Sequence, residues 1–151
     1  MIVGDEILQS FGVDQETFEH LIISKQENTL LQSLDMRYAE VTADRLVMKM
    51  PVGPKVHQPA GILHGGASVA LAETAASMAT FVNIDGNTKA PVGMEINANH
   101  IRSKKEGELT AVATPFHKGS TTMVWNIEIT DEKDKLICIS RCTMAVIDQQ
   151  K

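Results

Sequence analysis

Apolar residues recur with helical spacing in two segments of the chain. Phe18, Leu21 and Ile22 lie at positions i, i+3 and i+4 with polar residues around them, which predicts a helix over residues 14–26. Residues 64–82 are rich in alanine, the strongest helix former, and predict a second, longer helix.

Other segments alternate apolar and polar positions with the two-residue period of β-strands. Leu46, Met48 and Met50 place apolar side chains on one face of a short segment. Strands are predicted over residues 35–41, 45–50, 91–103, 108–117, 121–130 and 136–147. Residues 28–34 are expected to be a connector, and the proline-containing residues 51–63 are expected to form a loop.

The predicted order is two strands, one long helix and four strands joined by short loops. Short loops join antiparallel neighbours, and one helix cannot cover both faces of a six-stranded sheet. We therefore expect an α+β fold in which the sheet curls around the helix. Small residues along the helix permit this close approach: Ala67, Ala70, Ala72, Ala75, Ala76 and Ala79. The sheet still has an exposed edge, which favours an oligomer.

Composition fits one packed domain. The 151 residues are 43% apolar and 22% charged, which argues against global disorder. The formal net charge of −5 argues against a general nucleic-acid binder but leaves room for a local basic patch. The first residues lack the features of a signal peptide, and residues 60–84 hold too many small and polar residues for a bilayer span. We therefore expect a cytoplasmic protein without a nucleic-acid or membrane partner.

Cysteine and histidine spacing gives no sign of a metal site. Cys138 and Cys142 are too few for a disulfide framework and lack C-x-x-C spacing. No two of the five histidines have the H-x-x-x-H spacing of paired ligands: His20, His57, His64, His100 and His117. We expect neither a metal ion nor a separate cofactor.

Gly65 and Gly66 stand where the long helix is predicted to begin. Backbone N–H groups at a helix start lack partners within the helix and favour negative charge, so this end can bind a phosphate or polarise a carbonyl oxygen. The glycines can equally serve only to let the helix start against the sheet, and taken alone that interpretation is the stronger.

Glu73 is the one formal charge in residues 60–84 and lies among alanines in mid-helix. Carboxylates in apolar surroundings are often tuned to act as bases or nucleophiles. The alternative is a solvated side chain on an exposed stripe of the helix. Because no partner charge lies nearby along that stripe, we favour a functional role.

A third group of candidate residues is basic. His100 and Arg102 share one side of a predicted strand by its period of two. Together with Lys104, Lys105 and the turn at 117–118 they can form a pocket for phosphates. By itself, a solvated strand end is the simpler interpretation.

Together these residues resemble a known family. The pattern H-G-G-A-S-x-x-x-A-E at residues 64–73, followed by N-A-N-H-x-R-S at 97–103, is similar to the hotdog-fold acyl-CoA thioesterases of the phenylacetate-pathway type. That group includes 1,4-dihydroxy-2-naphthoyl-CoA hydrolases and 4-hydroxybenzoyl-CoA thioesterases. The resemblance covers residues 35–147. It implies a hotdog domain over 31–151, preceded by a helical extension over 1–30.

The resemblance also implies roles for individual residues. Glu73 matches the catalytic carboxylate, as nucleophile or as general base towards water. The Gly65 N–H matches the donor to the thioester carbonyl, and Gln58 and His64 match the polar groups that flank it. Ser77 matches a hydroxyl that positions water. Coenzyme A, which is part of the substrate, is expected against His100, Arg102, Ser103, His117, Gly119, Ser120 and Thr121.

The spacing of two of these residues bears on assembly. Gly65 and Glu73 lie eight residues apart on one helix, about 12 Å at 1.5 Å per residue. Both cannot reach one thioester carbon from the same chain. If both act, Gly65 of one subunit must meet Glu73 of another, as in a two-fold dimer with antiparallel helices. The resemblance implies such homodimers, often paired into tetramers.

The leading hypothesis is hydrolysis of an aromatic or medium-length acyl-CoA. A hotdog dehydratase or hydratase for 3-hydroxyacyl thioesters is the second, because His64 and Glu73 would both be present. A non-enzymatic acyl-CoA-binding module is the third. The scarcity of basic residues in 1–30 argues against a DNA-binding sensor.

Overall fold

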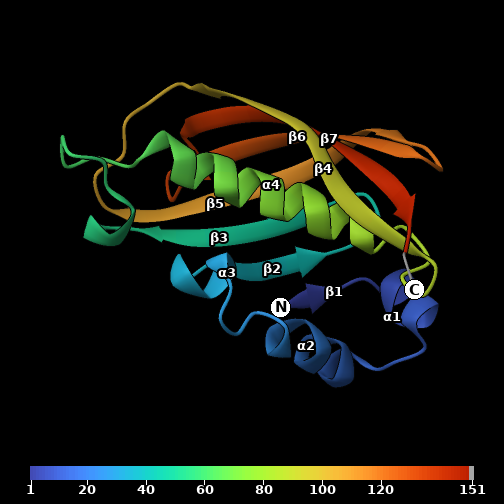
Figure 1. Ribbon diagram of the computed structural model, residues 1–151. Helices are drawn as coiled ribbons and strands as arrows, with labels where there is room; N and C mark the ends of the chain where they lie inside the picture. The colour runs from blue at the N-terminus through green and yellow to red at the C-terminus, as the bar shows by residue number, and fades with distance from the viewer. Residues whose placement is uncertain (150–151) are drawn as a thin grey trace.

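The computed structural model describes residues 1–149 as helices and strands in one chain (Figure 1). In order, these are β1 (Ile2–Val3), α1 (Asp5–Phe11), α2 (Gln15–Ser24), α3 (Leu30–Ser33), β2 (Arg37–Val41), β3 (Leu46–Val52), the 3₁₀ turn η1 (Pro54–Val56), α4 (Gly65–Phe81), β4 (Lys89–His100), β5 (Gly107–Lys118), β6 (Thr122–Asp131) and β7 (Leu136–Asp148).

The strands form one seven-stranded sheet in the order β1-β2-β3-β5-β6-β7-β4. All neighbours pair antiparallel except β1 and β2, which pair in parallel. Figure 1 shows the sheet curling behind α4, with β4 passing over the helix at one edge. The predicted α+β hotdog fold is confirmed.

The sequence missed three short elements. The sheet has one strand more than expected because Ile2 and Val3 add β1 to β2. Such a two-residue strand is too short to show an alternating pattern. The bounds of α1 were not predicted, although it falls in the helical extension expected over 1–30, and the segment expected as a connector holds α3. The strand expected over 91–103 ends at His100.

The buried face of α4 fixes the helix against the sheet. Ala72, Ala75 and Ala76 are fully buried, so the backbone of the helix approaches the strands closely. The Trp125 indole N–H of β6 donates to the Thr80 hydroxyl at 2.8 Å, and that hydroxyl donates to the Ala76 carbonyl at 2.9 Å. This bonded pair ties the second half of α4 to the middle of the sheet.

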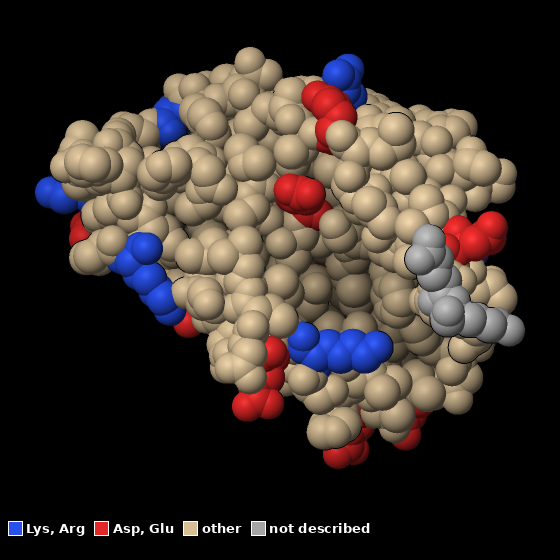
Figure 2. Space-filling view, in the orientation of Figure 1, with Lys and Arg blue, Asp and Glu red and all other residues tan. Residues whose placement is uncertain are grey.

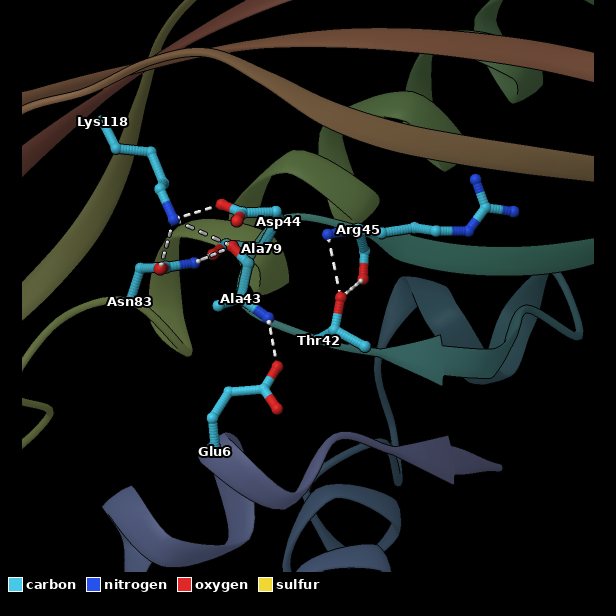
Figure 3. A network of polar contacts seen from close by, with 8 residues as sticks. All are labelled: Glu6, Thr42, Ala43, Asp44, Arg45, Ala79, Asn83 and Lys118. Atoms are coloured by element: carbon cyan, nitrogen blue, oxygen red, sulfur yellow. Dashed lines mark hydrogen bonds and ion pairs between the residues drawn. The ribbon is translucent and has the colours of Figure 1, made fainter.

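The N-terminal helices pack onto the same core. Ile7 of α1 and Phe18 of α2 are buried in it. The Glu6 carboxylate accepts a hydrogen bond from the Ala43 N–H at 3.1 Å, which joins α1 to the turn after β2 (Figure 3). No helix in the described residues 1–149 is long and apolar enough to cross a bilayer.

The edge strand β4 differs from the strands inside the sheet. Within the described part of the chain it pairs with β7 alone, and none of its residues is buried. Val92 and Met94 lie exposed near its middle, and Met94 is 64% exposed. An open, partly apolar edge of this kind favours pairing with another strand.

Candidate active site

The start of α4 presents an unpaired backbone donor. His64 is the N-cap, and its ring Nδ1 accepts a hydrogen bond from the Gly66 N–H at 2.8 Å. Because Nδ1 accepts, the neutral ring carries its proton on Nε2 and can donate there. The Gly65 N–H donates to no acceptor in residues 1–149. It stands where a helix N-terminus favours a developing negative charge.

Gly65 lies in close approach to a side chain of β4. A Cβ atom there would lie 2.6 Å from Nε2 and 3.0 Å from Cε1 of the His100 ring. The ring at the end of β4 therefore lies directly against the first residue of α4. This contact gives a packing reason for glycine at position 65, while its role as a donor to a carbonyl oxygen stays a prediction.

Gln58 is held by the turn that precedes α4. Its side-chain oxygen accepts from the Ala60 N–H at 3.0 Å, which leaves the amide NH₂ group to donate elsewhere. Backbone bonds from Gln58 N–H to the Ile62 carbonyl and from Gly61 N–H to the Gln58 carbonyl close this turn. Gly61 has φ of +74°, a conformation that favours glycine.

These groups line one cavity of about 580 Å³ at the start of α4. Six residues predicted from the sequence meet there: Gln58, His64, Gly65, His100, Arg102 and Ser103. The Arg102 guanidinium donates to the Leu136 carbonyl at 2.7 Å, and the side chain remains exposed. Although Arg102 lies beyond the end of β4, it faces the same cavity as His100, as expected.

Glu73 and Ser77 line a different cavity, of about 570 Å³, further along α4. They lie four residues apart on one face of the helix. A Cβ atom on Gly93 of β4 would lie 2.7 Å from Glu73 Oε1. The carboxylate therefore lies against the strand at a residue that has no side chain. Neither side chain forms a hydrogen bond or ion pair to another group in residues 1–149.

One expectation for Glu73 is corrected by the structure. The surrounding alanines do not bury it, because they face the sheet while Glu73 lies on the opposite, exposed face of α4. Figure 2 shows the same face hollowed beside α4, with charged side chains mostly around its margin. The carboxylate is open to solvent in one chain, and a second molecule would have to cover it.

The basic residues do not form a single pocket in one chain. The Lys104 ammonium binds the Glu132 carboxylate at 2.7 Å and lowers its pKa. At the other end of α4, Lys118 binds the Asp44 carboxylate and the Asn83 side-chain oxygen (Figure 3). The expected basic pocket of His100, Arg102, Lys104, Lys105 and the turn at 117–118 does not form within one chain, because that turn lies at the other end of α4 and acidic side chains pair with Lys104 and Lys118.

The turn between β5 and β6 lies with Lys118, away from the His100 cavity. The end of β5 and this turn carry the remaining predicted coenzyme A contacts: His117, Gly119, Ser120 and Thr121. The His117 ring folds over Gly119, where a Cβ atom would lie 2.6 Å from Nε2. Since α4 has 17 residues, about 26 Å of helix separates its two ends. These four residues therefore do not line the His100 cavity within this chain.

The two cysteines are poor candidates for a nucleophile. Burial raises the pKa of Cys142 to about 12, and the nearby Glu73 and Glu95 carboxylates add to the effect. Burial also raises the pKa of Cys138. Both side chains therefore stay protonated near neutral pH, and a thiol is a weak nucleophile.

The sequence missed part of the wall around Glu73. Leu30 and Leu31 of α3, Tyr38 of β2 and Phe81 at the end of α4 all line that cavity. A four-residue helix is too short for periodicity to reveal, and nothing in the pattern around Tyr38 marks it as facing a cavity.

Comparison with known proteins identifies the class of this fold and site. The sequence matches the Thioesterase superfamily over residues 60–138, just over half of the chain. That range contains the start of α4, Glu73, Ser77 and the His100–Ser103 segment. The chain belongs to this superfamily, and it is a thioester hydrolase.

Individual relatives are similar over most of their length. The chain is 57% identical over 121 residues to ComA2 of Bacillus subtilis, which is named as an esterase; the match covers 80% of this chain and 96% of that protein. It is 47% identical over 121 residues to the 1,4-dihydroxy-2-naphthoyl-CoA hydrolase of Escherichia coli, covering 80% and 88% of the two chains. A crystal structure of a mutant thioesterase from Pseudomonas aeruginosa superposes with a TM-score of 0.83 at 41% identity, covering 86% and 94%.

Proposed function

We propose that this protein hydrolyses acyl-CoA thioesters with an aromatic or medium-length acyl group, releasing the free acid and coenzyme A. The observation that carries the proposal is the unpaired Gly65 N–H at the start of α4, which lines a cavity with the Gln58 amide and the His64 ring. Two relatives named 1,4-dihydroxy-2-naphthoyl-CoA hydrolase support an acyl-CoA substrate.

Hydrolysis of a thioester places negative charge on the carbonyl oxygen as the tetrahedral intermediate forms. The Gly65 N–H would bind that oxygen, and one such donor contributes about 3 kcal/mol to the transition state. Gln58 NH₂ and His64 Nε2–H are further donors at the same cavity. The thiolate of coenzyme A is a good leaving group, so the reaction needs no cofactor beyond its substrate.

Glu73 would provide the basic group of the reaction. As a general base it takes a proton from water as the water oxygen attacks the thioester carbon, and returns the proton to the departing thiolate. As a nucleophile it attacks the carbon itself, and water then hydrolyses the resulting anhydride. Ser77, on the same face of α4 with a hydroxyl available, supports the positioning of water beside this carboxylate.

The complete site would be shared between two chains. Gly65 and Glu73 are eight residues apart on α4, about 12 Å, and line separate cavities. A two-fold dimer that pairs the exposed β4 edges would extend the sheet and set the two α4 helices antiparallel. Each Gly65 would then face Glu73 of the partner subunit, and the partner would cover the carboxylate that is open to solvent in one chain.

The substitution Glu73→Gln tests the proposal, since it keeps the size of the side chain and removes its basicity. We expect kcat for acyl-CoA hydrolysis to fall at least about 100-fold while KM changes little. Release of coenzyme A, followed with a thiol reagent, measures both. The matched control is Glu128→Gln, an exposed glutamate on β6 that should leave turnover unchanged.

Near-normal turnover in Glu73→Gln would remove this residue from the mechanism. If the unaltered protein released no thiol from aromatic or aliphatic acyl-CoA but added water to an enoyl-CoA, the hydratase hypothesis would replace hydrolysis. Tight binding of acyl-CoA without either reaction would favour a binding module.

A further inference from the structure

Part of the wall around Glu73 comes from the N-terminal region of the chain. Leu30 and Leu31 of α3 and Tyr38 of β2 line the 570 Å³ cavity together with Glu73. The catalytic assignments above leave these three residues without a role. A cavity of this size is typical of small-ligand sites, which are mostly apolar with a few polar groups that fix the orientation of the ligand.

Leu30 stands where two hollows meet. It is 55% exposed, and it lines both the Glu73 cavity and a second cavity of about 360 Å³ that reaches His64 and Gly66. Ala70 of α4 also lines both cavities. The two hollows therefore adjoin along the open face of α4, with α3 at their side. A large exposed apolar side chain at this position favours an apolar occupant, because burying it is favourable.

Tyr38 adds a polar group to the part of the wall that lies outside α4. Its side chain is half-buried, and burial raises its pKa to about 12, so the phenol stays protonated near neutral pH. Its hydroxyl forms no hydrogen bond to another group in residues 1–149. Because the side chain lines the cavity, a ligand there can supply the partner that the hydroxyl lacks within the chain.

The backbone of β2 is irregular directly beside Tyr38. The pairing of β2 with β3 shifts register between Tyr38 and Glu40, so Ala39 is an extra residue in the strand. Bulges of this kind redirect neighbouring side chains and occur often near active sites. The extra residue places Tyr38 on the same face of the sheet as the buried Val41, because their partners Met48 and Leu46 lie two residues apart in β3.

We propose that Tyr38 is a specificity-determining residue. Its hydroxyl hydrogen-bonds a polar substituent on an aromatic acyl group, and Leu30 and Phe81 hold the ring of that group by apolar contact. The proposal rests on the proposed function, because it takes the occupant of the cavity to be the acyl part of an acyl-CoA. The aromatic and proline side chains of the wall favour a flat ring over a flexible chain.

The test compares the unaltered protein with Tyr38→Phe, which removes one oxygen atom and keeps the ring. The substrates are benzoyl-CoA, its 2-, 3- and 4-hydroxy derivatives, and hexanoyl-CoA. We expect the unaltered protein to prefer at least one hydroxybenzoyl-CoA over benzoyl-CoA by about tenfold in kcat/KM, the effect of one hydrogen bond. In Tyr38→Phe this preference should disappear, while benzoyl-CoA and hexanoyl-CoA should react within about twofold of normal.

A matched pair of leucine variants tests the apolar wall. Leu30→Ser should raise KM for the aromatic substrates several-fold. Leu21→Ser, at an exposed leucine of α2 that does not line the cavity, should leave KM unchanged.

The proposal is overturned if Tyr38→Phe keeps the preference, or if it slows all five substrates equally, as a purely structural residue would. Equal reactivity of benzoyl-CoA and its hydroxy derivatives in the unaltered protein also overturns it. In both cases hydrolysis continues and the proposed function stands. If no acyl-CoA is hydrolysed, the proposed function fails, and calorimetric binding of hydroxybenzoyl-CoA against benzoyl-CoA still decides whether Tyr38 discriminates between them.

Discussion

The side-chain hydroxyls of α4 differ in whether they have a hydrogen-bond partner within the chain. Thr74 and Thr80 direct their hydroxyls back to the Ala70 and Ala76 carbonyls of their own helix. Ser77 forms no such bond in the described chain and lines the Glu73 cavity. A hydroxyl left without a partner inside the protein is available to a ligand or to water, which agrees with the role proposed for it.

Arg102 offers a test at the scale of one residue. Its guanidinium is exposed at the His100 cavity and bound on one side to the Leu136 carbonyl, so other N–H groups remain to bind phosphate. Arg102→Ala should raise KM for an acyl-CoA about tenfold with little change in kcat, because uniform binding is lost. A pantetheine thioester with the same acyl group lacks the nucleotide phosphates and should be hardly affected.

Arg45→Ala is the matched control. Arg45 is exposed directly before β3, pairs with Glu40 and does not line the His100 cavity. It should leave KM unchanged for both substrates. Equal losses on acyl-CoA and on the pantetheine thioester in Arg102→Ala would show that Arg102 acts on something other than the nucleotide.

At the scale of elements, the attachment of α4 to the sheet decides how accurately both cavities are placed. The helix has few large side chains to hold it, and its buried stripe consists mostly of alanine. The Trp125–Thr80 hydrogen bond is therefore a specific contact in an interface whose other contacts are largely nondirectional. Losing the acceptor would leave a buried indole N–H without a partner.

Thr80→Val should lower the free energy of unfolding by about 1–3 kcal/mol. Thr74→Val is the control, because Thr74 is only half-buried and bonds only to its own helix. It should cost less than about 0.5 kcal/mol. Denaturant unfolding of the two variants measures the difference, and equal values would mean that the Trp125 contact adds no stability.

Long elements could be predicted from the sequence, whereas short ones could not. The alanine-rich helix was expected over 64–82 and is observed as Gly65–Phe81, since its composition and its glycine start agree. β1 and α3 escaped prediction because two to four residues cannot show a period. Their formation depends on tertiary contacts, such as the pairing of β1 with β2.

The candidate site, too, could be predicted only in part from the sequence. Gln58, His64, Gly65 and His100 were expected together and line one cavity. The exposure of Glu73 could not be read from its alanine neighbours, because their composition does not say which side of the helix faces the sheet. The acidic partners of Lys104 and Lys118 are distant in the sequence and were likewise invisible to local spacing.

At the scale of the whole molecule, one chain holds two incomplete halves of the proposed site. The donor half lies at the start of α4, and the carboxylate half lies two turns further on, in a separate cavity. The exposed β4 edge and the weakly charged face beside α4 (Figure 2) offer a surface through which a second copy can complete both. The account therefore predicts that activity belongs to the dimer and not to the single chain.

Mixing two inactive variants tests this most directly. One variant carries Glu73→Ala, and the other carries Gln58→Ala with Gly65→Val, whose side chain would collide with the His100 ring. Each homodimer lacks the same half of both its sites and should be inactive. After co-refolding, about half of the dimers are mixed, and in each of these one site receives both intact halves.

The mixture should therefore regain roughly one quarter of the normal activity. A control mixture of Glu73→Ala with Glu73→Gln, both damaged in the same half, should remain inactive. The shared-site account predicts recovery in the first mixture alone. If that mixture stays inactive although mass spectrometry shows that mixed dimers have formed, Gly65 and Glu73 do not complete one another across subunits, and the account is contradicted.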